Sequence, residues 1–369
     1  MPNEFEKLSA QITRAIEAKF LEQNIRVRAG AELEYIVSDS NMRSPHPNLL
    51  GIPGMLLHPN YDEQGELRNA DPSSTKPDFE KDPLFPNSRI ISTHYKEHGN
   101  SHYETVFSYN AEQSNPARLG WAIESTKKEL TKKCGKRGMD VDFSSVPKDS
   151  TMTNGMHITL SLEDATTGEA IFPKETIEGR DPLLDRLLPL CEHMLPTLSE
   201  SVPLCIPSDQ SFSRIHNQRL SQNNPPTDMK SGRNGGVVSP RIGKHTSPYI
   251  EIRLAGSDAN AHHVMATAMT ALHNAFTRIG SLETNPDNEK QRIFVPTPGI
   301  KVPRYDSDIA KNLRDATLRM ERGNHLRQTL NDLSSHLKLG DKFCQSASDY
   351  ARDNIESADM SHHSSNRGR

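Results

Sequence analysis

Four segments of this 369-residue chain alternate apolar and polar side chains, and this alternation restricts the fold more than any other feature. The segments cover residues 25–37, 102–109, 155–162 and 248–254. Because successive residues of a strand point to opposite faces of a sheet, each segment predicts a strand with one apolar and one polar face. The chain lacks regular βαβ alternation, so the pattern favours an α+β domain built on an antiparallel sheet.

The polar faces of these strands carry side chains that can bind divalent cations. Glu32 and Glu34 share one face of the first strand, about 6.6 Å apart along it. Together with the segments that follow, they make a set of five glutamates and one histidine: Glu32, Glu34, Glu97, Glu104, His157 and Glu251. Carboxylates and a single imidazole on a common face would suit two Mg²⁺ or Mn²⁺ ions. Taken alone, each residue is more often an ordinary charged or structural residue than a ligand, and spacing alone does not bring the four faces together.

Helical periodicity separates the predicted strands. Residues 3–22 have the apolar spacing of an amphipathic helix, and Asn3 with Glu6 predicts a capping box at its start. Further helices are predicted after Pro116, over 181–200, from 260 to 279 and over 307–354. Residues 41–92 contain eight prolines and predict a long irregular excursion over the surface, whereas 356–369 predict a frayed tail.

Composition excludes several classes of protein. A net charge of −4 and an aromatic content of 5% provide neither the electrostatic attraction nor the stacking surface expected of a nucleic-acid-binding or membrane-binding protein. The four cysteines are scattered and predict reduced thiols instead of a disulfide framework or a zinc site. No apolar run approaches the roughly 18 residues that span a bilayer, and the N-terminus lacks a signal-peptide layout. We therefore expect a soluble cytoplasmic protein.

Four motifs, taken in order, resemble the catalytic domain of the glutamine synthetase family. Residues 30–35 (GAELEY) resemble its first paired-glutamate strand, and 97–104 (EHGNSHYE) are similar to the segment that carries two metal glutamates seven residues apart. Residues 154–162 (NGMHITLSL) resemble the GMHxHxSL strand, and 250–253 (IEIR) followed by 258–261 (DANA) resemble the IExR…ANPY segment. The resemblance extends over about residues 27–350. It implies a glutamine synthetase/guanido kinase-like fold, in which helices pack on the outer face of a curved antiparallel sheet.

The resemblance also implies a domain division and a chemistry. We expect an N-terminal helix over 1–26, a catalytic domain over 27–350 and a flexible tail over 351–369. The implied activity is an ATP-dependent carbon–nitrogen ligase that uses two Mg²⁺ or Mn²⁺ ions and joins a glutamate-like carboxylate to an amine through an acyl phosphate. Small molecules, and neither nucleic acids nor membranes, are the expected partners, and the ring assemblies of the family make a homo-oligomer a candidate state.

The resemblance assigns roles to individual residues. One metal would be held by Glu34, Glu97 and Glu104, and the other by Glu32, His157 and Glu251. The expected catalytic residues are Arg253, Arg241 and Glu97. The substrate carboxylate is expected at Arg214, Arg253, Asn154 and Gly155, and the nucleotide at Arg241, Thr159 and Tyr249.

Several positions depart from the family pattern. Thr159 stands where the family has a second histidine, and Tyr249 where it has an arginine, both on the nucleotide side. Residues 216–232 lack the glutamate with which the family closes the site over the amine, and Asp228 is their only acid. Only the predicted helix over 3–22 precedes the first catalytic strand, where the family has a small β-rich domain. These differences make the amine, ammonia or another, the open part of the prediction.

Two alternatives to an active ligase follow. The chain could be a catalytically idle relative that binds or regulates, given its altered nucleotide-side residues. It could also be a phosphotransferase or another ligase of the same broader scaffold, such as a guanidino-kinase-like or glutamate–cysteine-ligase-like enzyme. The nearby histidines His94, His98 and His102 are expected to be polar surface residues.

Overall fold

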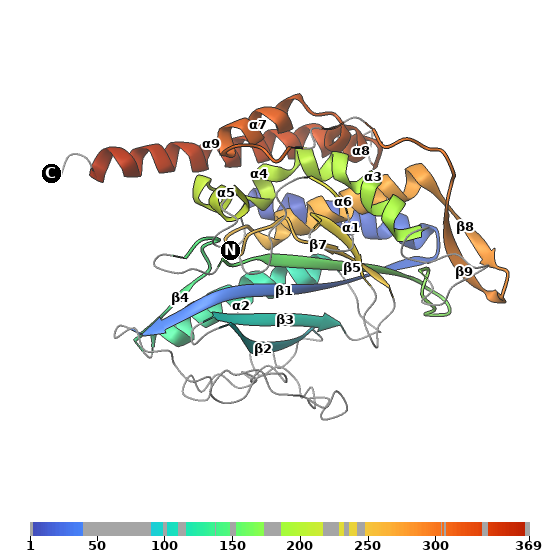
Figure 1. Ribbon diagram of the computed structural model, residues 1–369, viewed down its shortest axis with the longest axis horizontal. Helices are drawn as coiled ribbons and strands as arrows, with labels where there is room; N and C mark the ends of the chain where they lie inside the picture. Colours follow the sequence, from blue (N-terminus) through green and yellow to red (C-terminus); the bar gives the residue numbers. More distant parts are fainter. Residues whose placement is uncertain are drawn as a thin grey trace.

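An antiparallel sheet with helices stacked over its apolar face forms the body of the molecule (Figure 1). The computed structural model describes residues 3–39, 90–98, 102–109, 116–136, 138–147, 153–172, 186–216, 229–231, 236–241, 248–303, 305, 308–333 and 339–365. Within these ranges the strand order is β2-β3-β1-β5-β7-β6, and β4 pairs with one end of β1. The predicted α+β class with an antiparallel sheet is confirmed.

The strands of the main sheet are β1 (Ile25–Asp39), β2 (Ile90–His98), β3 (His102–Tyr109), β4 (Met139–Asp142), β5 (Met156–Asp164), β6 (Val238–Arg241) and β7 (Tyr249–Ile252). A separate hairpin consists of β8 (Gly280–Asn285) and β9 (Asn288–Pro296). The helices are α1 (Glu4–Glu22), α2 (Pro116–Gly135), α3 (Leu188–Glu200), α4 (Val202–Cys205), α5 (Asp209–His216), α6 (Ala261–Ile279), α7 (Leu313–Arg322), α8 (His325–Leu333) and α9 (Leu339–Ser365).

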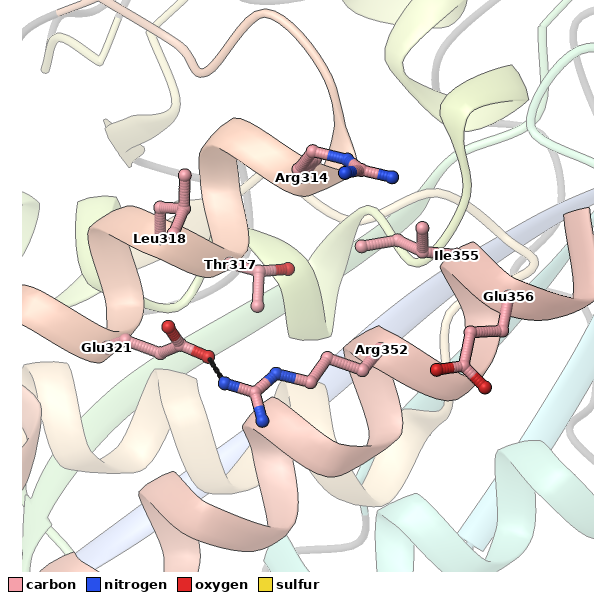
Figure 2. Close-up of a pocket in the computed structure, with 7 residues that line it drawn as sticks. All are labelled: Arg314, Thr317, Leu318, Glu321, Arg352, Ile355 and Glu356. Atoms are coloured by element: carbon pink, nitrogen blue, oxygen red, sulfur yellow. Dashed lines mark hydrogen bonds and ion pairs between the residues drawn. The ribbon is translucent and has the colours of Figure 1, made fainter. Parts of the chain in front are cut away.

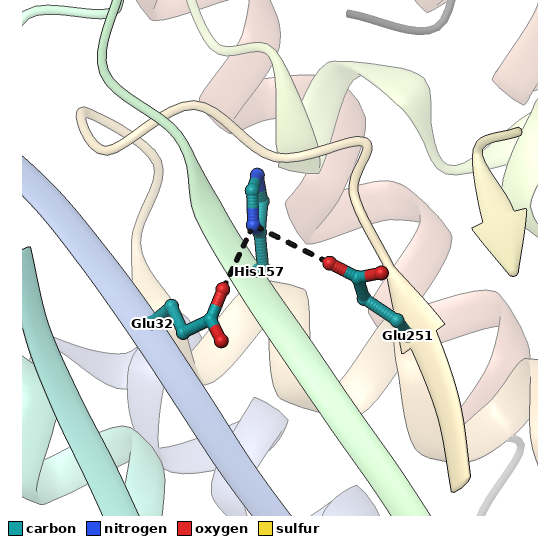
Figure 3. Close-up of side chains that lie close together, drawn as sticks. All are labelled: Glu32, His157 and Glu251. Carbon is teal, nitrogen blue, oxygen red and sulfur yellow. Dashed lines mark hydrogen bonds and ion pairs between the residues drawn. The ribbon is translucent and has the colours of Figure 1, made fainter. Parts of the chain in front are cut away.

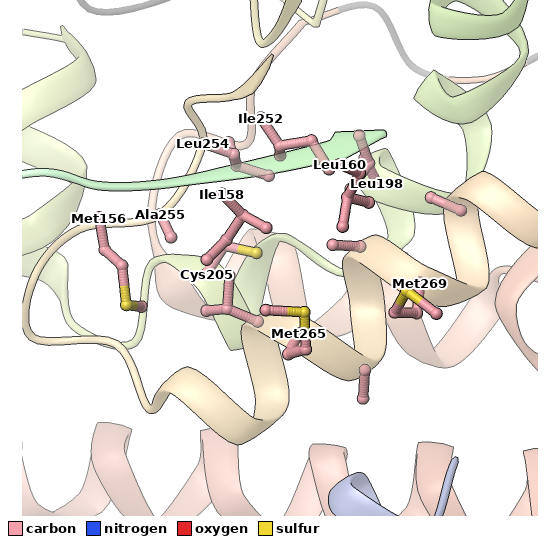
Figure 4. Close-up of a cluster of buried hydrophobic side chains, with 14 of the residues drawn as sticks. Met156, Ile158, Leu160, Leu198, Cys205, Ile252, Leu254, Ala255, Met265 and Met269 are labelled. Carbon is pink, nitrogen blue, oxygen red and sulfur yellow. The ribbon is translucent and has the colours of Figure 1, made fainter. Parts of the chain in front are cut away.

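The apolar residues of the alternating strands form the floor of the hydrophobic core. On β1 the side chains of Ala29, Leu33 and Val37 are at most 2% exposed. Figure 4 shows Ile158 of β5 facing Met265 on helix α6, with side chains of α3 and α4 closing the cluster. Since burial of apolar area is the main driving force of folding, this packing commits the opposite, polar face of the sheet to solvent or ligand.

The start of helix α1 shows how local signals become tertiary contacts. Asn3 and Glu6 form the predicted capping box, with Asn3 Oδ1 accepting from the Glu6 amide at 2.7 Å. The same Glu6 carboxylate accepts a hydrogen bond from Asn260, the residue that caps α6, at 2.8 Å. The caps of two packed helices are therefore linked to each other.

The structure differs from the sequence-based expectations at three places. Strand β2 begins at Ile90, inside the stretch expected to be irregular up to residue 92. The hairpin of β8 and β9 was not predicted from the sequence, because its exposed, charged strands lack clean alternation. Helix α9 continues to Ser365, through most of the segment expected to be a tail.

A pocket of about 270 Å³ lies between α7 and α9, in the outer helical layer (Figure 2). Arg352 of α9 forms an ion pair of 2.6 Å with Glu321 of α7 across it. None of the residues lining this pocket belongs to the set predicted for the active site. Among the described residues, no helix combines the length and apolarity needed to cross a membrane.

Candidate active site

Strand β5 pairs with β1 on one side and with β7 on the other, and this pairing brings three of the predicted metal ligands onto one face of the sheet. Glu32 of β1 lies directly opposite His157 of β5. Glu251 of β7 lies opposite Thr159, two residues along β5 from His157 and therefore on the same face. Residues more than 200 positions apart in the chain become neighbours through this register.

Glu32, His157 and Glu251 converge as a triad of possible metal ligands (Figure 3). His157 Nδ1 lies 3.2 Å from Glu32 Oε2 and 3.6 Å from Glu251 Oε1. One ligand atom from each residue lies within 4.8 Å of the other two. Donors that share one Mg²⁺ lie about 2.0–2.1 Å from it and so at most about 4.2 Å apart, which requires only small movements here. Two carboxylates and one imidazole fit Mg²⁺ or Mn²⁺ chemically, and this triad contains all three residues expected for one metal.

Two arginines surround the Glu251 carboxylate. Arg241 donates from Nε to Glu251 Oε2 at 2.6 Å, and Arg253 Nε lies 3.7 Å from Glu251 Oε1. Burial would raise the pKa of Glu32, but its hydrogen bond to His157 and nearby positive charge together lower that pKa. The surroundings of Glu32 thus favour its ionised carboxylate, the form that binds a cation.

The predicted second metal set is only partly within the described side chains. Glu34 lies directly opposite Glu104 on the adjacent strand β3. Glu34 is 3% exposed, and its Oε2 accepts a hydrogen bond from the Gly155 amide at 2.6 Å. Glu97 occurs in β2 at the register shift between Lys96 and His98, and its side chain lies outside the described part of the structure. The backbone brings these three strands side by side, and their joint role as a metal site stays a prediction.

Arg214 approaches this end of the site from helix α5. Its side chain is buried, with 4% of the residue exposed, and its Nη1 donates to the Leu254 carbonyl at 3.5 Å. The Nε of Arg214 has no hydrogen-bond partner among the described residues. Burial lowers the pKa of Arg214, although the charge of Glu34 opposes this shift. A buried guanidinium with an unsatisfied donor suits a carboxylate ligand.

Glycine suits position 155 because two side chains crowd around it. A Cβ at this position would lie 2.5 Å from Nη2 of Arg214 and 2.9 Å from Nε2 of His157. The absent side chain therefore allows the arginine of α5 to reach the histidine of β5. This proximity places the triad and Arg214 in one site.

Asn154 stabilises the backbone next to the site through hydrogen bonds of its side chain. Its side chain is fully buried and donates to the carbonyls of Asp142 and Ser144 at 3.0 and 2.9 Å. Its Oδ1 lies 3.0 Å from Nε2 of His102, which makes that nitrogen the donor. The side chain of Asn154 thus fixes the start of β5. The expectation that His102 lies on the surface is wrong: it is 1% exposed, because it closes this network.

Asp258 is a supporting residue that the sequence did not reveal. Its carboxylate accepts hydrogen bonds from three hydroxyls, those of Ser145, Ser208 and Ser211. Ser208 directly precedes α5 and Ser211 lies in its first turn, so Asp258 ties the start of the helix that carries Arg214 to the loop after β7. These serines come from two segments distant from each other and from Asp258, so the cluster has no signature in the sequence and only the fold brings it together.

Comparison with known proteins identifies the family. The family model described as glutamine synthetase, catalytic domain, matches residues 10–366, nearly the whole chain. The chain belongs to the glutamine synthetase family. Its triad and Arg214 are thus found on the fold on which the sequence motifs predicted them.

Individual relatives of this glutamine synthetase family member are distant. The gamma-glutamylputrescine synthetase PuuA of Escherichia coli (strain K12) is 29% identical over 167 residues, which cover 44% of this chain and 33% of that enzyme. The match thus spans about a third of the length of the curated relative.

Solved structures agree in fold. Plasmodium falciparum glutamine synthetase superposes with a TM-score of 0.62 at 14% identity, covering 95% of this chain and 77% of that one. The protein GmaS in complex with ADP gives a TM-score of 0.58 at 15% identity, with 95% and 74% covered. At this level of identity the likeness concerns the fold alone.

Proposed function

We propose that this protein is an ATP- and divalent-metal-dependent ligase that joins the carboxylate of glutamate, or of a related acid, to an amine. The convergence of Glu32, His157 and Glu251 carries the proposal, since buried and half-buried carboxylates gathered around an imidazole are costly unless a cation is to be bound. Membership of the glutamine synthetase family and the unsatisfied donor of Arg214 support it.

The proposed reaction has two steps. A carboxylate oxygen of the acid attacks the γ-phosphorus of ATP, the bond to the β-γ bridging oxygen breaks, and ADP leaves. The amine nitrogen then attacks the carbonyl carbon of the acyl phosphate, the carbon–oxygen bond to phosphate breaks, and the nitrogen loses a proton. A metal bound at the triad would supply positive charge that offsets the charge developing on the phosphoryl oxygens.

The arginines have separate tasks in this proposal. Arg214, at the Gly155 end, would bind the acid substrate through its carboxylate. Arg253 and Arg241, which border Glu251, would stabilise negative charge on the reacting carboxyl and phosphoryl groups. We further propose that Tyr249 and Thr159, which lie beside these groups on β7 and β5, contact the nucleotide.

The amine is the substrate for which the chain departs most from the family pattern. The name of PuuA describes a synthetase of gamma-glutamylputrescine, in which glutamate is joined to an amine larger than ammonia. We propose that this chain also accepts an organic amine. We expect it to act in the cytoplasm, and none of its four buried cysteines forms a disulfide.

A substrate panel tests the proposal. Protein would be incubated with ATP, Mg²⁺ or Mn²⁺, glutamate and either ammonia or one of several mono- and diamines, and ADP and the amide would be measured. We expect ADP release that depends on metal, acid and amine together, and at least a hundredfold slower release with Glu32→Gln. Glu283→Gln, on an exposed strand of the hairpin, is the matched control. Absence of ADP release with every combination would refute the ligase proposal.

One observation favours the second candidate, an idle binding or regulatory protein. The Arg241 guanidinium donates to the Glu251 carboxylate at 2.6 Å, so a metal would have to compete with this arginine for Glu251. Calorimetry with Mn²⁺ separates the two functions. Saturable binding that Glu32→Gln abolishes supports the ligase, whereas no binding in the presence of ATP supports the idle protein.

A further inference from the structure

The polar face of the sheet divides into two ends of opposite charge around the triad. On β1 the residues that share the face of Glu32 are Glu34 toward one end, and Gly30, Arg28 and Arg26 toward the other. Burial confirms which residues of β1 face which side, because the intervening Val27 and Ala29 lie on the apolar face and are only 1% and 2% exposed. Arg214 and the acidic pair of Glu34 and Glu104 lie at the first end, and Arg28 lies at the second.

Arg28 is held on this face by a buried carboxylate. Glu163 of β5, 3% exposed, forms ion pairs with Arg28 and, at 2.8 Å, with Arg26. Two guanidiniums share one carboxylate, so the cluster carries a net charge of about +1. The Arg28 side chain remains 31% exposed and reaches the solvent side of the sheet. A guanidinium anchored in this way loses little rotamer freedom when it binds an anion.

Small side chains cover the polar face of the sheet between the triad and Arg28. Gly30 lies directly opposite Thr159, and a Cβ on Gly30 would lie 2.7 Å from Thr159 Oγ1. Arg28 lies about 13 Å from Glu32 along β1. Between Arg28 and the triad, the residues of β1 and β5 on this face are Gly30 and Thr159 alone. An extended anionic chain that ends at the triad can lie across these two residues.

We infer that Arg28, positioned by Glu163, binds the polyphosphate chain of the nucleotide. The inference rests on the proposed function, because it needs a nucleotide whose terminal phosphate lies at the triad. The charge layout orients that nucleotide, since its phosphates are repelled by the acidic end and attracted by Arg28 at the other end. Arg28 thereby supplies positive charge on the side where Thr159 and Tyr249 replace the basic residues of the family pattern.

Nucleotide binding by variants tests this assignment. The affinity of the wild type for the non-hydrolysable analogue AMP-PNP with Mg²⁺ would be measured by calorimetry, together with the affinity for adenosine. We expect Arg28→Ala to bind AMP-PNP about ten- to a hundredfold more weakly, the loss of one charge-assisted hydrogen bond, with adenosine affinity unchanged. Arg28→Lys, which keeps the charge, should recover part of the affinity. In turnover, KM for ATP should rise and KM for glutamate should not.

Arg26→Ala is the matched control, because Arg26 binds the same Glu163 carboxylate but lies two residues further from the triad. It should bind AMP-PNP within about twofold of the wild type. Equal losses in both arginine variants, or no loss in Arg28→Ala, would overturn the role of Arg28 while leaving the proposed function intact. A wild type that binds no nucleotide would instead overturn the proposed function, and circular dichroism on each variant excludes misfolding as the cause of a loss.

Discussion

At the scale of single residues, the site depends on the absence of a side chain at Gly155. Gly155 leaves the space through which Nη2 of Arg214 and Nε2 of His157 approach one another. Its amide in turn donates to Glu34 at 2.6 Å. One glycine therefore determines the relative position of an arginine, a histidine and a glutamate, and none of these relations follows from the residue types alone.

Gly155→Ala should disable the site without unfolding the chain. The new Cβ would displace Arg214 and His157, so we expect KM for glutamate to rise at least tenfold and the free energy of unfolding to fall by about 1–3 kcal/mol. Steady-state kinetics and urea unfolding measure the two effects. Gly135→Ala, where no atom lies within 4 Å of the added Cβ, should change neither quantity appreciably. Unchanged kinetics in Gly155→Ala would show that Arg214 has no part in the reaction.

At the scale of elements, helix α5 is placed by its contacts with a loop from another part of the fold. Asp258 accepts from Ser145 at 2.5 Å and from Ser208 at 3.3 Å, and it also binds Ser211. Since Arg214 is on the same helix, the position of α5 sets the position of the expected carboxylate ligand.

Asp258→Asn removes one acceptor oxygen while keeping the shape of the side chain. We expect α5 to loosen and KM for glutamate to rise several-fold. AMP-PNP affinity should stay within about twofold, because Arg28 lies on the opposite side of the triad from Arg214. The same substitution at Asp287, in the exposed turn of the hairpin, is the control. Loss of nucleotide affinity equal to the loss for glutamate would argue for general destabilisation and against a positioning role.

Helix α6 carries a histidine that is buried in its neutral form. Burial lowers the pKa of His263 to about 3, and its ring stacks on Phe5 with Nδ1 2.8 Å from Ser9 Oγ. The neighbouring His262 opposes a second positive charge, and the ring of Tyr350 from α9 lies 5.1 Å away. In the unfolded chain this residue takes up a proton near pH 6.5, whereas in the folded protein it does not. The free energy of unfolding therefore decreases as the pH falls below that value.

The consequence is a loss of stability on the acid side. Stability from His263 is complete above about pH 6.5 and declines as the pH falls toward 3, by about 2 kcal/mol between pH 6.5 and pH 5. Urea unfolding at pH 7.5 and pH 5.0 measures the decline. In His263→Phe, which keeps the stack but cannot titrate, the decline should be smaller by about that amount. An identical decline in both proteins would contradict the assignment.

At the scale of the whole molecule, the sheet separates two tasks. Its apolar face holds the core with α1, α2, α3, α4 and α6, and its polar face concentrates carboxylates and guanidiniums. The two carboxylates of the triad repel each other, and a ligand that binds only the folded state stabilises it, so binding of a cation at the triad should stabilise the entire fold.

Mn²⁺ should therefore raise the unfolding temperature. At a hundredfold excess over its Kd, a ligand adds about 2.7 kcal/mol to the free energy of unfolding, which corresponds to a shift of several degrees. Differential scanning calorimetry with Mn²⁺, and after removal of the metal with EDTA, measures the shift. Glu32→Gln should show little of it. A shift of equal size in that variant would place the bound metal elsewhere.

Much of the secondary structure of this protein could be predicted from its sequence, because the relevant signals are local. Alternation determined which residues of β1 and β5 share a face, so that Glu32, Glu34 and His157 could be assigned to the polar side. The capping box of α1 and the long apolar pattern of α6 likewise depend only on neighbours along the chain. Resemblance to a family extended these local facts to a fold and to a ligand set.

Tertiary structure alone decided which residues touch. The register that sets Glu32 opposite His157, the contact of Arg241 with Glu251, and the sharing of Glu163 by Arg26 and Arg28 all join segments far apart in the chain. A shift of one residue between β1 and β5 would leave the local pattern of each strand unaltered and dissolve the triad. Alternation determines the face on which a side chain stands, but its partner is selected by the packing of the whole sheet against its helices.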